Sequence, residues 1–163
     1  MSSFGEMFTR YFARVYKFAL KLTRSTDLAE DITQQTFYKA LSMIDRFEGK
    51  SDVGTWLCSI AKNEYFTRCR RREASAGLDS AALDAASGDV ADRVQQEAER
   101  MQIHRHLHAL EEPYREVFML RVFGELKYAQ IASLFGRTES WARVTYYRAK
   151  LEIQKRMEED EHV

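Results

Sequence analysis

The part of the sequence that most constrains the fold runs from Tyr128 to Arg156, where a short helical pattern, a glycine and a longer helical pattern follow one another. The apolar residues of the first pattern recur at helical spacing: Ile131, Ala132 and Phe135. Gly136 can adopt the left-handed conformation that ends a helix, and Thr138 or Ser140 can cap the next one. This order predicts a helix-turn-helix.

The second helix of this motif is rich in basic residues, which are Arg143, Arg148, Lys150, Lys155 and Arg156. Its N-terminal half would then enter a DNA groove. An ordinary helical hairpin with solvated basic side chains shows the same pattern. The rest of the chain has to decide between these two interpretations.

The charges of the chain are segregated along the sequence. With 25 Lys+Arg and 25 Asp+Glu the net charge is zero, which excludes a uniformly basic nucleic-acid-binding surface. Residues 62–72 and 137–156 form two basic blocks, and mostly acidic residues lie between them and at the C-terminus. Any nucleic-acid role must therefore rest on local patches.

Nothing in the sequence indicates a membrane or secreted protein. No apolar run approaches the roughly 18 residues of a membrane span, and the N-terminus lacks a signal peptide pattern. Cys58 and Cys69 lie too far apart on one predicted helix to form a disulfide. We expect a cytoplasmic protein with reduced thiols and no membrane insertion.

Helical periodicity dominates the chain, and no segment alternates at period two. One amphipathic helix covers 8–22, and a second begins at Asp27 with a capping-box pattern and reaches Ile44. Residues 45–54 interrupt the periodicity before a third helix from Thr55. Helical periodicity resumes over 94–110, and Pro113 suits the first turn of the next helix.

These patterns predict an all-α protein with two small helical domains. The segment from about 74 to 90 is rich in Ala, Ser, Gly and Asp, which is typical of a flexible acidic linker. We therefore predict an N-terminal helical bundle at 1–73, a linker at 74–93 and a C-terminal helix-turn-helix domain at 94–163.

Three stretches of the sequence are distinctive. Two lie in the N-terminal half, DLAEDITQQTFYKAL and DRFEGKSDVGTWLCSIAKNEYF, and are followed by the arginines at 70–72; the third is LHALEEPYREVFMLRVFGELKYAQIASLFGRTESWARVTYYRAK in the C-terminal half. The first two resemble region two, and the third resembles region four, of bacterial RNA polymerase sigma factors of the extracytoplasmic-function type. The resemblance implies a transcription initiation factor that binds core polymerase, directs it to promoters and is controlled by an anti-sigma factor. It also implies no enzyme activity and no cofactor.

In the family, the helix that matches the one from Asp27 docks on the clamp helices of the largest polymerase subunit. The matching positions here are Asp27, Glu30, Asp31, Gln34 and Gln35. The family commonly has Glu at the position of Gln35, so a hydrogen bond is expected there in place of a charged contact. A solvated polar helix face is the alternative interpretation.

The loop 46–53 and the helix after it match the part of the family that opens and reads the downstream promoter element. A separated base needs an aromatic surface to stack on, polar groups at its edge and cations along its phosphates. The residues expected to supply these functions are Arg46, Phe47, Lys50, Ser51, Asn63, Arg68, Arg70, Arg71 and Arg72. Trp56 fits either the core or a DNA contact.

The family places the second helix of the helix-turn-helix in the major groove of the upstream promoter element. The expected contacts are Arg137, Thr138, Ser140, Arg143, Val144, Tyr147 and Arg148. Two residues depart from the common family pattern, because Trp141 replaces a small polar residue and Thr145 replaces a frequent arginine. The promoter sequence therefore does not transfer from other members.

Two rival functions remain open from the sequence. A helix-turn-helix regulator that acts without polymerase explains the C-terminal motif but not the N-terminal half. A nucleic-acid enzyme would use His104, His106 and His108, but on a helix only the first and third share a face, and no carboxylate or cysteine completes a ligand set. We therefore expect no metal site.

Overall fold

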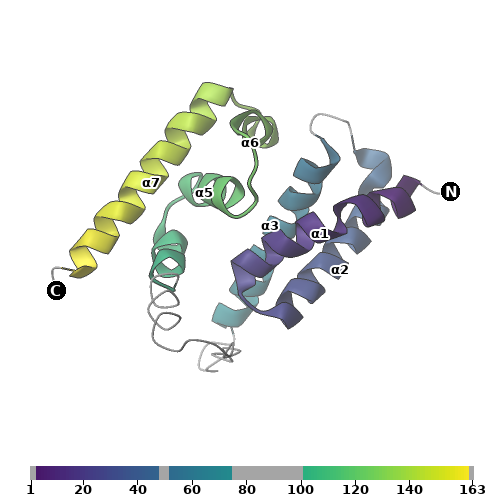
Figure 1. Ribbon diagram of the computed structural model, residues 1–163, viewed down its shortest axis with the longest axis horizontal. Helices are drawn as coiled ribbons and strands as arrows, with labels where there is room; N and C mark the ends of the chain where they lie inside the picture. The colour runs from purple at the N-terminus through teal and green to yellow at the C-terminus, as the bar shows by residue number, and fades with distance from the viewer. Residues whose placement is uncertain (1–2, 48–51, 75–100, 162–163) are drawn as a thin grey trace.

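The computed structural model describes residues 3–47, 52–74 and 101–161, and these residues confirm the all-α prediction. The first three helices and a short 3-10 turn form a group that we call the N-terminal bundle (Figure 1). Its elements are α1 (Ser3–Thr23), α2 (Thr26–Met43), η1 (Ile44–Arg46) and α3 (Val53–Ala74). The predicted linker lies almost wholly outside the described residues, and the domain boundaries stay a prediction.

The start of α2 differs from the sequence prediction. Ser25 is the N-cap, since its hydroxyl accepts a hydrogen bond from the Leu28 backbone at 3.3 Å. Asp27 lies in the first turn, where its negative charge complements the helix dipole. The predicted capping box at Asp27 was therefore wrong, because the cap is Ser25, two residues earlier.

The remaining helices form the C-terminal group, which lies beside the N-terminal bundle (Figure 1). It comprises a helix at residues 101–109, α5 (Tyr114–Val122), α6 (Tyr128–Phe135) and α7 (Glu139–Glu161). Pro113 is the N-cap of α5, one residue before the predicted position in the first turn.

Helices α6 and α7 form the predicted helix-turn-helix. Gly136 has the left-handed conformation with a φ of 63°, which a residue with a side chain adopts rarely. The Thr138 hydroxyl then accepts a hydrogen bond from the Trp141 backbone at 3.1 Å and so starts α7. Local chemistry at these two residues fixes the turn.

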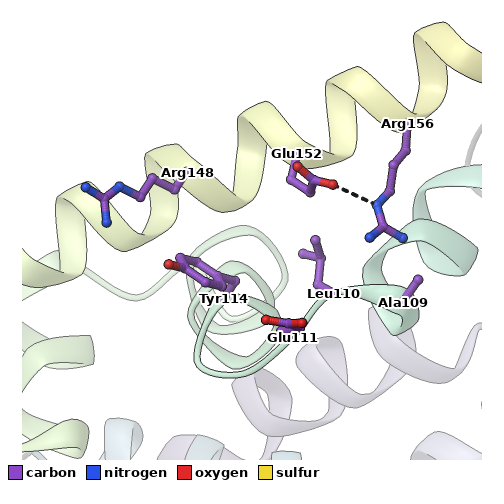
Figure 2. A pocket seen from close by; sticks show the side chains of 7 residues that line it. All are labelled: Ala109, Leu110, Glu111, Tyr114, Arg148, Glu152 and Arg156. Atoms are coloured by element: carbon purple, nitrogen blue, oxygen red, sulfur yellow. Dashed lines mark hydrogen bonds and ion pairs between the residues drawn. The ribbon is translucent and has the colours of Figure 1, made fainter.

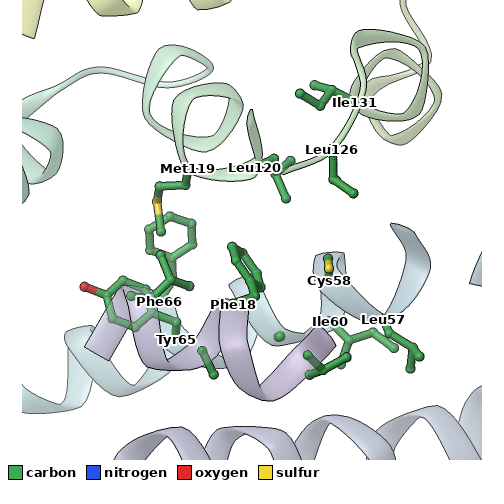
Figure 3. Close-up of a cluster of buried hydrophobic side chains, with 14 of the residues drawn as sticks. Phe18, Leu57, Cys58, Ile60, Tyr65, Phe66, Met119, Leu120, Leu126 and Ile131 are labelled. Carbon is green, nitrogen blue, oxygen red and sulfur yellow. The ribbon is translucent and has the colours of Figure 1, made fainter. Parts of the chain in front are cut away.

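One hydrophobic core joins the two helical groups. In Figure 3, Met119 and Leu120 of α5 extend toward Phe18 of α1 and Phe66 of α3. Leu126, in the segment between α5 and α6, is also fully buried in this cluster. The sequence predicted two separate domains and did not predict that they pack together.

Polar contacts cross the same boundary. Lys62 of α3 forms an ion pair with Glu116 of α5 at 3.0 Å, and only 9% of the Lys62 side chain is exposed. Asp52, just before α3, accepts a hydrogen bond from the Gln130 side chain of α6 at 2.6 Å. The beginning of the helix-turn-helix therefore touches the segment that precedes α3.

Two features outside these contacts also bear on the sequence predictions. Cys58 and Cys69 both lie on α3 as thiols and not as a disulfide, and burial raises the pKa of Cys58 to about 11. Within the described ranges, no helix combines the length and apolar character that crossing a membrane would require.

Candidate nucleic-acid and polymerase interfaces

The N-terminal half of α7 exposes one continuous face. Arg143, Val144, Tyr147 and Arg148 are all exposed, with Tyr147 at 59% and Val144 at 47%. They occupy positions i, i+1, i+4 and i+5, which share one side of a helix. The opposite side is buried through Ala142, Thr145, Ala149 and Ile153. The core thus orients α7 so that this face points to solvent.

The two arginines on this face differ in how firmly they are held. Arg143 donates a hydrogen bond to Glu139 at 3.1 Å, and its guanidinium lies 5.1 Å from the centre of the Tyr128 ring. Arg148 has no ion pair among the described residues, and it lines a hollow of about 430 Å³ (Figure 2). Its guanidinium therefore has room to reorient.

The same hollow lies between the middle of α7 and the segment that leads into α5. Its other lining residues are Ala109, Leu110, Glu111, Tyr114, Glu152 and Arg156. Figure 2 shows the ion pair between Glu152 and Arg156 on α7, with a distance of 3.1 Å. Charges of both signs line this space, so it does not extend the basic face.

The residues of the turn before α7 are also accessible. Arg137, Thr138 and Ser140 are all exposed, although Thr138 is engaged as the helix cap. Trp141 instead packs against Phe135, with ring centres 5.3 Å apart. Thr145 is only 5% exposed and faces the core. The second unusual residue of this helix is therefore directed away from the exposed face.

A second exposed strip follows α3. Asn63 and Arg70 are exposed and lie seven residues apart, which is two helical turns on one side. At the start of the strip, the Phe47 ring lies 4.7 Å from the Trp56 ring, and both are half-buried. This pair presents an aromatic surface next to polar and basic groups, so Trp56 belongs partly to the surface.

The basic residues near this strip are not equivalent. Arg46, Arg71 and Arg72 are exposed. Arg68 is half-buried, and its buried Nε has no hydrogen-bond partner within the described part of the chain. Lys62 belongs to the basic block in the sequence, yet it is buried against Glu116. Lys50 and Ser51 lie outside the described residues.

A third surface lies on α2. Asp27, Glu30, Asp31 and Gln34 are exposed, and Gln35 is half-buried. The same face continues with two large exposed side chains that we did not single out from the sequence: Tyr38 at 69% and Leu41 at 50%. Their spacing from Gln34, at four and seven residues, was the signal that they share its face.

The three histidines serve separate contacts. His106 is hydrogen-bonded to Asp160 at 2.6 Å, which ties the acidic end of α7 to the helix at 101–109. His108 is hydrogen-bonded to the Tyr65 hydroxyl at 2.7 Å. His104 stacks on Phe123, with ring centres 5.2 Å apart. No metal-binding group of His, Cys, Asp or Glu side chains occurs in the described part of the chain.

His104 also faces the N-terminal bundle. Burial lowers the pKa of His104 to about 4, and the positive charge of Arg24 and the neighbouring His108 act in the same direction. This imidazole is therefore neutral near pH 7, and its neutral form favours the packing of the two helical groups.

Comparisons with known proteins agree with this arrangement. The family described as Sigma-70 region 2 matches residues 7–75, and the family described as Sigma-70, region 4 matches residues 100–153. RNA polymerase sigma factor YlaC of Bacillus subtilis (strain 168) is 28% identical over 163 residues, covering 95% of this chain and 92% of YlaC. ECF RNA polymerase sigma factor SigM of the same organism is 26% identical over 153 residues, and the alignment covers 91% of this chain and 91% of SigM.

Solved structures show the same fold. The sigma factor RpoE in complex with the anti-sigma factor NepR from Bartonella quintana aligns with a TM-score of 0.63 and 23% identity, covering 97% of this chain and 98% of RpoE. CnrH in complex with the cytosolic domain of CnrY aligns with a TM-score of 0.65 and 19% identity, covering 96% and 88%.

The two family matches lie on the N-terminal bundle and on the C-terminal group, in that order along the chain. The chain therefore belongs to the sigma-70 family of RNA polymerase sigma factors, of the extracytoplasmic-function type.

Proposed function

We propose that this sigma factor binds core RNA polymerase through the exposed face of α2 and reads a promoter at two separate surfaces. The observation that carries the proposal is the exposed face of α7, because a core-anchored helix presents Arg143, Val144, Tyr147 and Arg148 together. The second surface is the strip on α3. The membership of the chain in the sigma family supports this division of roles.

At the upstream element, α7 enters the major groove with its N-terminal half. An arginine can donate two hydrogen bonds to one guanine, which discriminates against other bases by about 1–3 kcal/mol. Val144 and Tyr147 offer apolar contact with a thymine methyl group. Because Thr145 is buried, it adds no base contact of its own, and the promoter preference rests on the four exposed residues.

At the downstream element, the rings of Phe47 and Trp56 offer a stacking surface for a base that has left the duplex. Asn63 can donate and accept hydrogen bonds at a base edge. Arg70, Arg71 and Arg72 neutralise phosphates, which strengthens binding without specifying sequence.

On α2, the exposed carboxylates of Asp27, Glu30 and Asp31 would meet basic groups of the clamp helices of the largest polymerase subunit. Tyr38 and Leu41 add apolar area on the same face, so the surface offers more than charge. The interpretation as a merely solvated helix face does not explain two large exposed apolar side chains beside the acidic group.

In this function the polymerase carries out the chemistry, and the sigma factor is neither an enzyme nor dependent on a cofactor. It would act in the cytoplasm, where the polymerase works. An anti-sigma factor is the expected regulator, because RpoE was solved in complex with NepR. A helix-turn-helix regulator that acts without polymerase is disfavoured by the match of residues 7–75 to sigma region 2.

Transcription with purified components tests the proposal. Core polymerase and this protein are incubated with a promoter library, and transcripts are sequenced. We expect specific start sites that are absent with core polymerase alone. Glu30→Arg combined with Asp31→Arg should abolish both core binding and these transcripts, whereas Glu158→Arg on the far end of α7 should not. If the wild-type protein neither binds core polymerase nor yields a specific transcript, the proposal fails.

A further inference from the structure

The Tyr128 ring lies close to two guanidinium groups that come from different helices. The Arg121 guanidinium of α5 lies 4.2 Å from the centre of the Tyr128 ring, and the Arg143 guanidinium of α7 lies 5.1 Å from it. Tyr128 is the first residue of α6. Its ring therefore links the first helix of the helix-turn-helix to an exposed arginine on the second.

The ring itself has a fixed environment. Arg121 donates a hydrogen bond to the backbone carbonyl of Leu126 at 2.9 Å, which holds its guanidinium beside the ring. The Tyr146 ring lies 6.0 Å away from the Tyr128 ring. Tyr128 is half-buried, so neighbouring groups limit the rotation of its side chain.

Arg143 is thus restrained although it is accessible. The Tyr128 ring lies close to its guanidinium and Glu139 accepts a hydrogen bond from it, while 55% of the Arg143 side chain remains exposed. Arg148, five residues further along α7, has no such restraint among the residues described. A restrained arginine loses less rotamer freedom when it binds DNA than a free one does.

We propose that Tyr128 is a positioning residue for the upstream promoter element: its ring holds the Arg143 guanidinium in the orientation that reads a base. This role rests on the proposed function, since it requires that Arg143 contact DNA. It assigns part of the sequence preference to a side chain outside the reading helix, and it requires the aromatic ring but not the hydroxyl group.

Comparison of Tyr128→Leu with Tyr128→Phe tests this role. The full chain is assembled with core polymerase, and fluorescence anisotropy measures affinity for promoter fragments that carry each base at each upstream position. The promoter comes from selection with the wild-type holoenzyme, and Arg143→Ala identifies the position that Arg143 reads. Tyr128→Leu should reduce the preference at that position about two- to five-fold, and Tyr128→Phe should retain it.

A double-mutant cycle separates positioning from general support of the fold. In the Arg143→Ala background, Tyr128→Leu should cause no further loss of preference, because the group that it positions is absent. The role would be overturned if Tyr128→Leu weakened DNA binding equally on all sequences, both in the wild-type and in the Arg143→Ala background. It would also be overturned if Tyr128→Phe behaved like Tyr128→Leu.

Folding and the dependence on function are checked separately. If Tyr128→Leu lowers the melting temperature by more than about 5 °C, Tyr128→Met takes its place, since its flexible side chain refills the site without a ring. If the wild-type holoenzyme shows no preference at any upstream position, the upstream part of the proposed function fails and this inference fails with it. If the wild type is selective and both ring-free variants match it, only this inference fails.

Discussion

The ion pair between Lys62 and Glu116 gives the sharpest test of how the two helical groups are held together. Only 9% of the Lys62 side chain and 23% of the Glu116 side chain are exposed, and the Lys62 ammonium also lies 5.8 Å from the centre of the Phe135 ring. Lys62→Met keeps the unbranched apolar part of the side chain but removes the ammonium group that pairs with the Glu116 carboxylate. We expect this change to open the contact between the groups.

The size of the effect follows from burial. Removing one partner of a fully buried ion pair costs about 3–5 kcal/mol. Because water can reach part of Glu116, a loss of about 2 kcal/mol is more realistic. This loss raises the ratio of open molecules, in which the two helical groups have separated, to closed molecules, in which they are packed together, about 30-fold. Lys62→Met combined with Glu116→Met should return toward the closed state, since no unpaired charge is then buried.

The assay is a distance measurement between the two helical groups. Spin labels are attached at Ser42 on α2 and Glu158 on α7, both exposed, in a Cys69→Ser background. Pulsed electron paramagnetic resonance should show a longer and broader distance distribution for Lys62→Met than for the parent. Small-angle X-ray scattering should show a larger radius of gyration.

Lys39→Met is the matched control, because Lys39 pairs with Glu64 inside the N-terminal bundle. It removes the same kind of ion pair and should lower the free energy of unfolding without changing the distance between the groups. An unchanged distribution in Lys62→Met, or an equal change in Lys39→Met, would refute the argument.

Three further predictions concern DNA, pH and helix capping. Arg148→Ala should relax the preference at one upstream base by about 1–3 kcal/mol. Arg71→Ala should instead weaken binding to all promoter sequences and flatten the salt dependence of binding. Footprinting at several salt concentrations measures both effects, and the reverse pattern would show that these roles are misassigned. Because the pKa of His104 is lowered to about 4 from its usual 6.5, the unfolded state binds more protons between these values. The contribution of His104 to the free energy of unfolding is therefore complete above pH 6.5. Below that pH it falls by at most about 1.4 kcal/mol for each pH unit. In urea unfolding measured at several pH values, His104→Phe should lack this part of the pH dependence of the free energy of unfolding. Ser25→Ala should cost about 1 kcal/mol through the lost α2 cap, with Thr26→Ala as the neutral comparison in thermal unfolding.

Local chemistry explains which parts of the fold were predictable from the sequence. The turn of the helix-turn-helix depends on Gly136 and Thr138, whose conformational and hydrogen-bonding preferences act within a few residues. The start of α2 was misplaced because Ser25 and Asp27 are both good capping residues only two positions apart. The pattern alone gave no means of choosing between them.

The contact between the two helical groups could not be predicted in the same way. It joins residues 54 positions apart, as in Lys62 and Glu116, and 104 positions apart, as in Lys21 and Glu125. Helical periodicity identifies which side chains are buried but not which helix covers them. Lys62 was grouped with the basic block because sequence cannot distinguish a buried, paired lysine from a solvated one.

The zero net charge of the chain is compatible with DNA binding because the charges act over limited distances. The acidic end of α7 is anchored through Asp160 to His106, twelve residues beyond Arg148. At about 1.5 Å per residue this separation is about 18 Å, which exceeds the screening length of about 10 Å at 0.1 M salt. The acidic end therefore does not cancel the attraction of the reading face for phosphates at physiological salt. Local exposure of charge, rather than its sum over the sequence, decides which surface of this sigma factor meets DNA.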